Sequence, residues 1–428
     1  RMCSGRKQHR RRHNHPPFVC AIHPVPRLPV YTAEGAGSRG ILTRCTRSPA
    51  PTLRLPDSIT IVRIRWEEKQ LKGSQIGLAV VGSGRIGTLR ARLAARHPAV
   101  NFLAVSDIDP ANAKKLAEKA GADFYSGSND EIIARPEVTA VIVSTPEGEH
   151  AAPVRKALSL GKPVLVEKPI ALTLNDADAI LAELKQSGGN LHVGYSRRYK
   201  ECFLRAKEQI NQGRLGQIIG GTARVYNKRT SAFNILKRDP HATPVLDVLT
   251  YYVDLMCWFM EGIRPVEIVA RGNKKLFKGY EADDMNWAIM SFEDGAVMNL
   301  GVSYALPAHY PTQGQSDRVE LLGIDGAMMI DDDHLNHLLY SEKGVAHAYI
   351  PGHSEDMVFL GSTTPGDWAA GDFWGPMANE TRAWLDHLST GSTTVQTTPQ
   401  QARLNLEVTL AIVRAVQTGK PVTLPFSG

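Results

Sequence analysis

A short apolar strand that runs directly into a glycine-rich turn constrains this chain more than any other feature. Residues 78–81 are four apolar residues in a row, which is typical of a strand buried on both faces of a parallel sheet. Residues 82–87 follow with the spacing G-x-G-x-x-G. Gly82 allows a tight turn, Gly84 lets backbone approach a pyrophosphate, and Gly87 lets the next helix pack closely on the strand. The N-terminus of that helix offers unpaired N–H groups to phosphates, so the pattern predicts dinucleotide binding.

An acidic residue at the end of the next strand strengthens this prediction. The apolar run 100–106 ends in Asp107, twenty residues after Gly87, where the fingerprint requires an acid to bind the ribose hydroxyls of the adenosine. Ile108 follows, and it offers no positive charge to a 2′-phosphate. We therefore predict NAD as the cofactor in preference to NADP. The alternative is that Asp107 is only a turn residue.

The turn residues that we assign to cofactor binding are Gly82, Gly84, Arg85, Ile86 and Gly87.

Positive charge is concentrated at the start of the chain. The formal net charge of the 428 residues is +7. Residues 1–71 hold 14 Lys/Arg and 4 Asp/Glu, a net of +10, so the remainder has a net of −3. A mildly acidic body offers no basic face to nucleic acid, and we predict no nucleic-acid partner. We expect residues 1–71 to be a basic, disordered leader before a folded domain that begins near Lys72. A nucleic-acid-binding arm is the alternative for the leader.

Apolar runs and cysteines indicate the compartment. No apolar run reaches 18 residues, so we expect no membrane span. After the leader only Cys202 and Cys257 remain, which is too few for a disulfide framework and favours a reducing, cytoplasmic location. The acidic run 331–334 is typical of a solvated turn, and we assign no metal to it.

Strands and helices alternate from Lys72 to Tyr195. We predict strands at residues 78–81, 100–106, 140–143, 163–166 and 190–194, with helices between them. This rhythm predicts a doubly wound parallel sheet, which is an α/β Rossmann domain over residues 72–195. Ligands of such sheets bind beyond the carboxyl ends of the strands. The residues at those ends are Ser144, Thr145, Glu167, Lys168 and Tyr195.

The rhythm changes after Tyr195. Turn signals at residues 293–295 and 324–326, each between two strand-like runs, indicate hairpins. We predict a second, α+β domain over residues 196–428 with a largely antiparallel, open-faced sheet. A long loop is expected over residues 353–375. Its aromatic residues either cover a substrate or pack in the ordinary way; they are Trp368, Phe373 and Trp374.

Two stretches carry candidate chemistry. Lys168 stands at the mouth of a buried strand, where an ammonium is costly to desolvate unless it is used or paired. In residues 245–254, a helix would place Asp247, Tyr251 and Asp254 on one face. Polar groups that stripe an otherwise apolar helix indicate the wall of a site. The alternative is a capping aspartate with a core tyrosine.

These motifs together resemble the glucose–fructose oxidoreductase/inositol dehydrogenase/MocA (Gfo/Idh/MocA) family over roughly residues 77–424. The matching pieces are residues 82–87, Ser144-Thr145-Pro146 with His150, residues 161–169, residues 194–199, and Asp247 with Tyr251 and Asp254. The resemblance implies a Rossmann domain, an open-faced sheet domain used in oligomerisation, and pyridine-nucleotide oxidation or reduction of sugars and polyols. The family's usual histidine four residues after the aspartate is Tyr251 here, and its usual asparagine before the paired arginines is Ser196. Relatives that resemble glucose–fructose oxidoreductase also carry tyrosine at the first of these positions.

We therefore predict an NAD-dependent dehydrogenase acting on a secondary alcohol of a sugar, inositol or sugar acid. The predicted catalytic residues are Lys168, Tyr251 and Asp247. Besides the turn and Asp107, we assign to cofactor binding Ser144, Thr145, His150, Glu167, Lys168 and Arg197. We assign to substrate binding Lys168, Tyr195, Asp247 and Tyr251.

Tyr251 is the expected acid/base of this mechanism. Its free pKa of about 10 is too high to be useful alone, and we expect the charge of Lys168 to lower it. Asp247 would orient the pair or accept a sugar hydroxyl. We expect a homodimer or homotetramer. The alternatives are a dinucleotide-binding, sugar-sensing regulator without catalysis and an NAD-using glycosidase.

Overall fold

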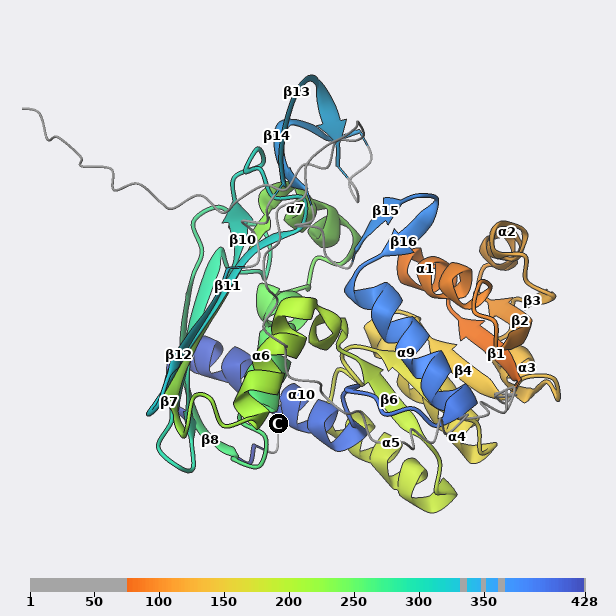
Figure 1. Cartoon of the computed structure of the whole chain (residues 1–428), viewed down its shortest axis with the longest axis horizontal. Coiled ribbons are helices and arrows are strands. Elements are labelled where there is room, and N and C mark those ends of the chain that lie inside the picture. Colours follow the sequence, from red (N-terminus) through yellow and green to blue (C-terminus); the bar gives the residue numbers. More distant parts are fainter. Residues whose placement is uncertain (1–74, 332–336, 348–351, 361–365, 427–428) are drawn as a thin grey trace, which may run out of the picture. The chain divides into compact units, whose positions relative to one another are not determined.

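The computed structural model describes residues 75–331, 337–347, 352–360 and 366–426 (Figure 1). The predicted leader, 1–71, and most of the acidic run 331–334 lie outside these residues. A six-stranded sheet comes first along the chain, and its strands are all parallel in the order β3-β2-β1-β4-β5-β6. These strands are β1 (Ile76–Val81), β2 (Val100–Ser106), β3 (Phe124–Ser126), β4 (Ala140–Val143), β5 (Val164–Glu167) and β6 (Leu191–Gly194). The strand order reverses between β1 and β4, which is where ligands of such sheets bind.

Helices connect these strands, as the sequence predicts. They are α1 (Arg85–Ala94), α2 (Pro110–Ala120), α3 (Asn129–Ala134), α4 (Ala151–Ser159) and α5 (Leu174–Ser187), with short 3₁₀ turns η1 (Glu147–Glu149) and η2 (Ser196–Tyr199). Local chemistry fixes their ends. The side chain of Asp109 accepts the N–H of Ala111 at the start of α2, and Gly121, with φ +69°, ends that helix.

A seven-stranded sheet follows, in the order β12-β11-β7-β10-β9-β8-β17. Its strands are β7 (Ile218–Lys228), β8 (Pro265–Asn273), β9 (Met285–Phe292), β10 (Val297–Leu306), β11 (Gln315–Gly323), β12 (Ala327–Asp331) and β17 (Val422–Thr423). Strands β7 and β10 pair in parallel, and the other neighbours pair antiparallel. The largely antiparallel sheet and both predicted hairpins, β9–β10 and β11–β12, are therefore confirmed.

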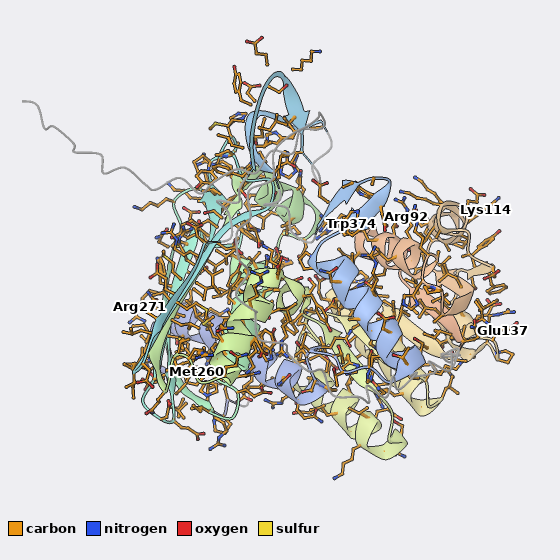
Figure 2. The ribbon with its side chains drawn as sticks, viewed as in Figure 1. Arg92, Lys114, Glu137, Met260, Arg271 and Trp374 are labelled. Carbon is orange, nitrogen blue, oxygen red and sulfur yellow. The ribbon has the colours of Figure 1, made fainter. Side chains whose placement is uncertain are left out.

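Helices cover one face of this second sheet and leave the other face open. The covering helices are α6 (Glu201–Asn211), α7 (Arg229–Arg238), α8 (Thr250–Phe259) and α10 (Pro399–Thr418), which share a core with the sheet. Arg271 lies on the open face (Figure 2). Trp287 on β9 pairs with Arg271 on β8 and is 37% exposed. Ile289, two residues further along β9, lies on the same face and is 46% exposed. This face therefore carries apolar area that the described chain leaves uncovered.

The predicted long loop over 353–375 is wrong. It contains strand β14 (Ser354–Leu360), which pairs with β13 (His337–Ala346), and the small hairpin of β15 (Asp367–Ala369) and β16 (Asp372–Trp374). Sequence reasoning missed β14 because its partner strand, β13, contains charged residues and a glycine, which do not indicate a strand. Phe373 is buried against α1, whereas Trp368 and Trp374 stay 42% and 52% exposed.

Helices near the C-terminus pack back against the first sheet. Trp384 and Leu385 of α9 (Pro376–Thr390) join the core beneath β1, and Ala402 and Leu406 of α10 join the core beneath β5. These contacts bring residues from the end of the chain into the cores on both faces of the first sheet. Among the described residues, no helix is both long and apolar enough to cross a membrane.

Candidate active site

The glycine-rich turn joins β1 to α1 and leaves open space at one glycine. Gly82 has φ +96°, and a Cβ there would lie 2.6 Å from the carbonyl oxygen of Ser144. A Cβ on Gly87 would lie 1.8 Å from the carbonyl oxygen of Gly82, so any larger residue would push α1 off the turn. A Cβ on Gly84 would meet nothing within 4 Å. The first two glycines serve close packing, and the open space at Gly84 lets a phosphate approach the backbone.

Polar groups next to this turn suit a dinucleotide. Asp107 Oδ2 accepts the N–H of Ser83 at 2.9 Å, and Asp107 Oδ1 accepts the N–H of Asp109 at 3.0 Å. The Oγ of Ser144, at the end of β4, is buried and has no hydrogen-bond partner among the described residues. A buried hydroxyl without a partner is costly, and a bound ligand that accepts its proton would remove the cost. These residues therefore fit NAD.

A second group of polar side chains meets at the end of β5. Lys168 Nζ donates to the backbone oxygen of Asp247 at 2.9 Å and lies 3.6 Å from Asp247 Oδ1. The same Nζ lies 5.1 Å from the centre of the Tyr251 ring. The side chain of Lys168 is only 10% exposed. The structure thus brings together the three residues that the sequence predicts to be catalytic.

A π-helical turn positions this group. Residues Val245–Leu249 form the turn, and the N–H of Thr250 donates to the carbonyl oxygen of Val245, five residues back. The α-helix α8 then begins at Thr250. The extra residue in the turn changes which side chains share a face, and such turns are frequent at functional sites.

Two further residues contact the group formed by Lys168, Asp247 and Tyr251. Tyr304, which is buried on β10, donates its hydroxyl to Asp247 Oδ2 at 2.7 Å. Arg197, which is 1% exposed, places its Cζ 5.1 Å from the centre of the Tyr251 ring. The ring of Tyr251 therefore lies near two cations, Lys168 and Arg197.

Burial decides the protonation of Tyr251. Removal from water raises the pKa of Tyr251 above its usual value, although Lys168 acts to lower it. The expectation that Lys168 would bring this pKa below 10 is therefore wrong, because desolvation of the phenolate outweighs the nearby charge. Burial also acts to lower the pKa of Lys168, but the charges of Tyr251 and Asp247 outweigh it and raise that pKa. Both groups hold their protons at neutral pH.

Comparisons with known proteins decide the family. Residues 76–195 match the model of the Gfo/Idh/MocA oxidoreductases with an NAD-binding Rossmann fold, and residues 203–329 match the C-terminal domain model of the same family. The chain belongs to the Gfo/Idh/MocA family. It is an NAD-binding oxidoreductase, as the sequence predicts.

Individual relatives in the family are distant but match over long stretches. A scyllo-inositol 2-dehydrogenase (NAD⁺) of Bacillus subtilis is 25% identical over 82% of this chain and 96% of that protein. A 2,7-anhydro-N-acetylneuraminate hydratase of Mediterraneibacter gnavus is 28% identical over 60% of this chain and 67% of that protein. The structure of a Lactobacillus casei scyllo-inositol dehydrogenase with NAD(H) and scyllo-inositol has a TM-score of 0.68 and 20% identity, and it covers 82% of this chain and 99% of that one.

Two residues of the family motifs that are predicted to bind the cofactor, Glu167 and His150, make contacts within the chain. Glu167 Oε1 accepts Arg90 Nε at 2.8 Å, and Arg90 also donates to Glu380 Oε2 at 2.5 Å. The Nδ1 of His150 lies 2.8 Å from the backbone oxygen of Pro169, and its Nε2 lies 3.1 Å from the backbone oxygen of Thr145. In this structure Glu167 and His150 therefore stabilise the loops on either side of Lys168.

The predictions for Asp254 and Tyr195 need correction. Asp254 does not join the site wall with Asp247, because it is buried and paired with Arg198, whose Nη2 lies 2.7 Å from Asp254 Oδ1. Tyr195 is 1% exposed, and its hydroxyl is 3.1 Å from Thr250 Oγ1. Its ring meets the ring of Tyr251 edge-on at 5.9 Å, so Tyr195 packs behind the site.

Sequence reasoning missed Tyr304, Arg90 and Glu380. The strand predicted after the turn at 293–295 covers residues 297–302. Its alternation of apolar residues at Met298, Leu300 and Val302, continued by two residues, would have placed Tyr304 on the helix-covered face. Arg90 and Glu380 are separated by 290 residues, and no local pattern links them.

Proposed function

We propose that this protein is an NAD-dependent dehydrogenase that oxidises a secondary alcohol of a cyclic polyol or sugar, with inositols as the first candidates. The observation that carries the proposal is the convergence of the Lys168 amine, the Asp247 carboxylate and the Tyr251 phenol beyond the end of β5. A hydroxyl-rich substrate needs donors and acceptors at close spacing, and this group supplies both.

NAD would be held by the glycine-rich turn, Asp107 and Ser144. When bound, NAD⁺ supplies the hydride acceptor for the carbon that bears the alcohol. Arg85 and Ile86 stand at the start of α1 and Thr145 at the end of β4, beside the same turn. Arg197 lies next to the ring of Tyr251, so we propose that it acts on the pKa of the tyrosine rather than contacting the cofactor directly.

The side chains of the protein move and hold the proton. Tyr251 is the group that exchanges a proton with the substrate oxygen, which is worth roughly 10²–10⁴-fold in rate for a well-placed acid or base. Protonated Lys168 donates a hydrogen bond to the same oxygen and stabilises negative charge on it. Asp247 orients Lys168 and accepts a hydrogen bond from a second hydroxyl of the substrate. Tyr304 fixes Asp247 through its hydrogen bond of 2.7 Å.

The distant relatives support this substrate class. The Bacillus subtilis relative that spans 82% of this chain is named a scyllo-inositol 2-dehydrogenase (NAD⁺), and a Rhizobium meliloti relative, 26% identical over 60% of this chain, is named an inositol 2-dehydrogenase. We also propose domain boundaries of 72–195 and 196–428, a cytoplasmic location and a homodimer or homotetramer. Within the described residues neither Cys202 nor Cys257 is in a disulfide, which agrees with a reducing compartment.

Substrate screening tests the proposal. The full chain is incubated with NAD⁺ and a panel of inositols, aldoses and sugar acids, and NADH is followed by its absorbance. A dehydrogenase gives net NADH that scales with the amount of polyol. A sugar-sensing regulator or an NAD-using glycosidase gives none, because neither consumes NAD⁺ overall. Binding of NAD⁺ without NADH formation from any polyol or sugar would contradict the proposal.

A further inference from the structure

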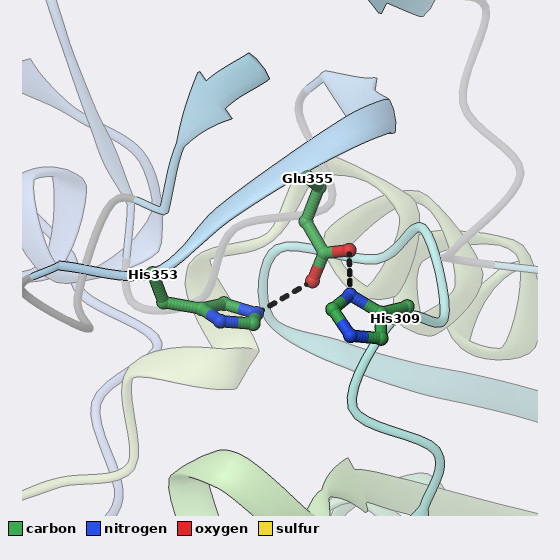
Figure 3. Close-up of side chains that lie close together, drawn as sticks. All are labelled: His309, His353 and Glu355. Carbon is green, nitrogen blue, oxygen red and sulfur yellow. Dashed lines mark hydrogen bonds and ion pairs between the residues drawn. The ribbon is translucent and has the colours of Figure 1, made fainter.

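Three side chains from separate segments meet outside the catalytic group. His309 lies in the loop after β10, His353 lies just before β14, and Glu355 lies on β14 (Figure 3). Their ligand atoms are all within 4.8 Å of one another. His353 Nε2 is 2.7 Å from Glu355 Oε1, and His309 Nδ1 is 3.4 Å from Glu355 Oε2. Both imidazoles therefore turn a nitrogen toward the same carboxylate.

Burial differs among the three residues in a way that suits an ion from solvent. The side chain of Glu355 is 3% exposed and that of His353 is 17% exposed, so surrounding atoms hold both in place. The side chain of His309 is 82% exposed. A cation can thus reach the cluster from the side of His309 and meet two ligands that are already fixed.

The donor types select a class of metal. Two imidazole nitrogens and one carboxylate oxygen are the donors that Zn²⁺ and similar divalent transition metals prefer, with a further position left for water. Mg²⁺ and Ca²⁺ prefer oxygen ligands throughout. We propose that His309, His353 and Glu355 form a binding site for a divalent transition-metal ion of the Zn²⁺ class. This site is independent of the proposed dehydrogenase reaction.

A lysine now balances the buried carboxylate. Lys228, at the end of β7, pairs with Glu355 Oε1. A dication at the cluster would share this carboxylate with Lys228.

A third histidine lies next to the cluster. The ring of His347 is 5.7 Å from that of His353. A bound ion would tie the loop after β10 to the base of the β13–β14 hairpin.

Metal titration of the full chain tests the proposal. The protein is stripped with a chelator and titrated with Zn²⁺ by calorimetry, and with Co²⁺ by visible absorption, which reports the ligand geometry. The matched variants are His309→Ala and, as a control, His241→Ala, since His241 is also exposed and also pairs with a glutamate, Glu281, at 2.8 Å. Histidines in residues 1–71 bind metal equally in all variants, so the difference between the variants is the readout.

We expect wild type and His241→Ala to bind one more ion than His309→Ala, or to bind it at least about 100-fold more tightly, because a lost ligand costs no less than a lost outer-shell partner. His353→Ala should have the same effect, with circular dichroism of the metal-free protein as the check on folding. Equal Zn²⁺ stoichiometry and affinity in wild type and His309→Ala would overturn the proposal, and so would a Co²⁺ spectrum that this substitution leaves unchanged.

Discussion

The Nζ of Lys168 lies 5.1 Å from the centre of the Tyr251 ring. Lys168 directly follows β5 of the first sheet, and Tyr251 lies in α8, which packs on the second sheet. The contact unites the dinucleotide-binding sheet with the helix that covers the second sheet. Because the two residues approach only in the folded chain, their relationship is the most specific support for a catalytic group at this position.

Removal of the Lys168 ammonium should be among the most damaging single changes. Lys168→Met removes the hydrogen bond to the backbone of Asp247 and the positive charge beside the substrate oxygen. We expect kcat/KM for polyol oxidation to fall by at least roughly 10²-fold, since electrostatic stabilisation of the developing oxyanion is lost. Lys156→Met, on the exposed side of α4, is the control and should keep wild-type kinetics. Equal activity of the two variants would remove Lys168 from the mechanism.

Asp107 should set the preference for NAD⁺. Its carboxylate accepts two backbone N–H groups at the turn, and it would repel a 2′-phosphate. Asp107→Ala should lower kcat/KM for NAD⁺ by about 10–100-fold, the value of a lost hydrogen bond to a charged group, and should narrow the gap to NADP⁺. Steady-state kinetics with both cofactors measures this. A wild-type preference for NADP⁺ would contradict the assignment.

The open face of the second sheet should bury its apolar residues in an oligomer. Trp287 and Ile289 are exposed there, and pairing of two such faces would cover them. Light scattering should give a dimer or tetramer for wild type and a smaller species for Ile289→Asp. Leu160→Asp, at an exposed position after α4, is the control and should keep the wild-type mass. A wild-type monomer at micromolar concentration would contradict the prediction.

Glu380 should make stability fall as the pH rises. Burial raises the pKa of Glu380 to about 7, whereas an unfolded glutamate titrates near 4.3. The folded chain therefore binds a proton in this window that the unfolded chain does not, so the contribution is complete below about pH 4 and is lost as the pH rises through about 7. We expect a loss of the order of 1–3 kcal/mol across the window.

Urea unfolding of wild type and Glu380→Gln at several pH values measures this contribution. Glutamine does not titrate, so the change in the free energy of unfolding between pH 5 and pH 8, a window that contains the folded-state pKa of about 7, should be smaller in the variant. A variant with the same slope as wild type would show that Glu380 keeps an ordinary pKa beside Arg90.

The sequence predicted the elements that depend on local patterns. Four apolar residues and three spaced glycines were enough for β1, the turn and α1, and the turn signals at residues 293–295 and 324–326 were enough for both hairpins. Lys168, Asp247 and Tyr251 could be picked out because each stands at a position where its residue type is unusual for the local pattern, and the structure brings them together. Their catalytic role stays a prediction.

Features that depend on distant contacts were not predictable in this way. Asp254 pairs with Arg198, which is 56 residues earlier in the chain, instead of lining the site. The pKa of Tyr251 depends on how much of the chain buries it, which no motif reports. The cluster of His309, His353 and Glu355 depends on the pairing of β14 with β13, which sequence reasoning missed.

The pH dependence of Tyr251→Phe tests the central claim most directly. Burial raises the pKa of Tyr251, so in wild type the phenolate that accepts the alcohol proton is scarce at neutral pH, and kcat for polyol oxidation should rise with pH. Tyr195→Phe is the matched control, because the hydroxyl that it removes lies behind the site, 3.1 Å from Thr250 Oγ1. We predict that Tyr251→Phe lowers kcat by roughly 10²–10⁴-fold and abolishes the rise with pH. Tyr195→Phe should keep both. A Tyr251→Phe enzyme with near wild-type kcat and the same pH profile would contradict the account.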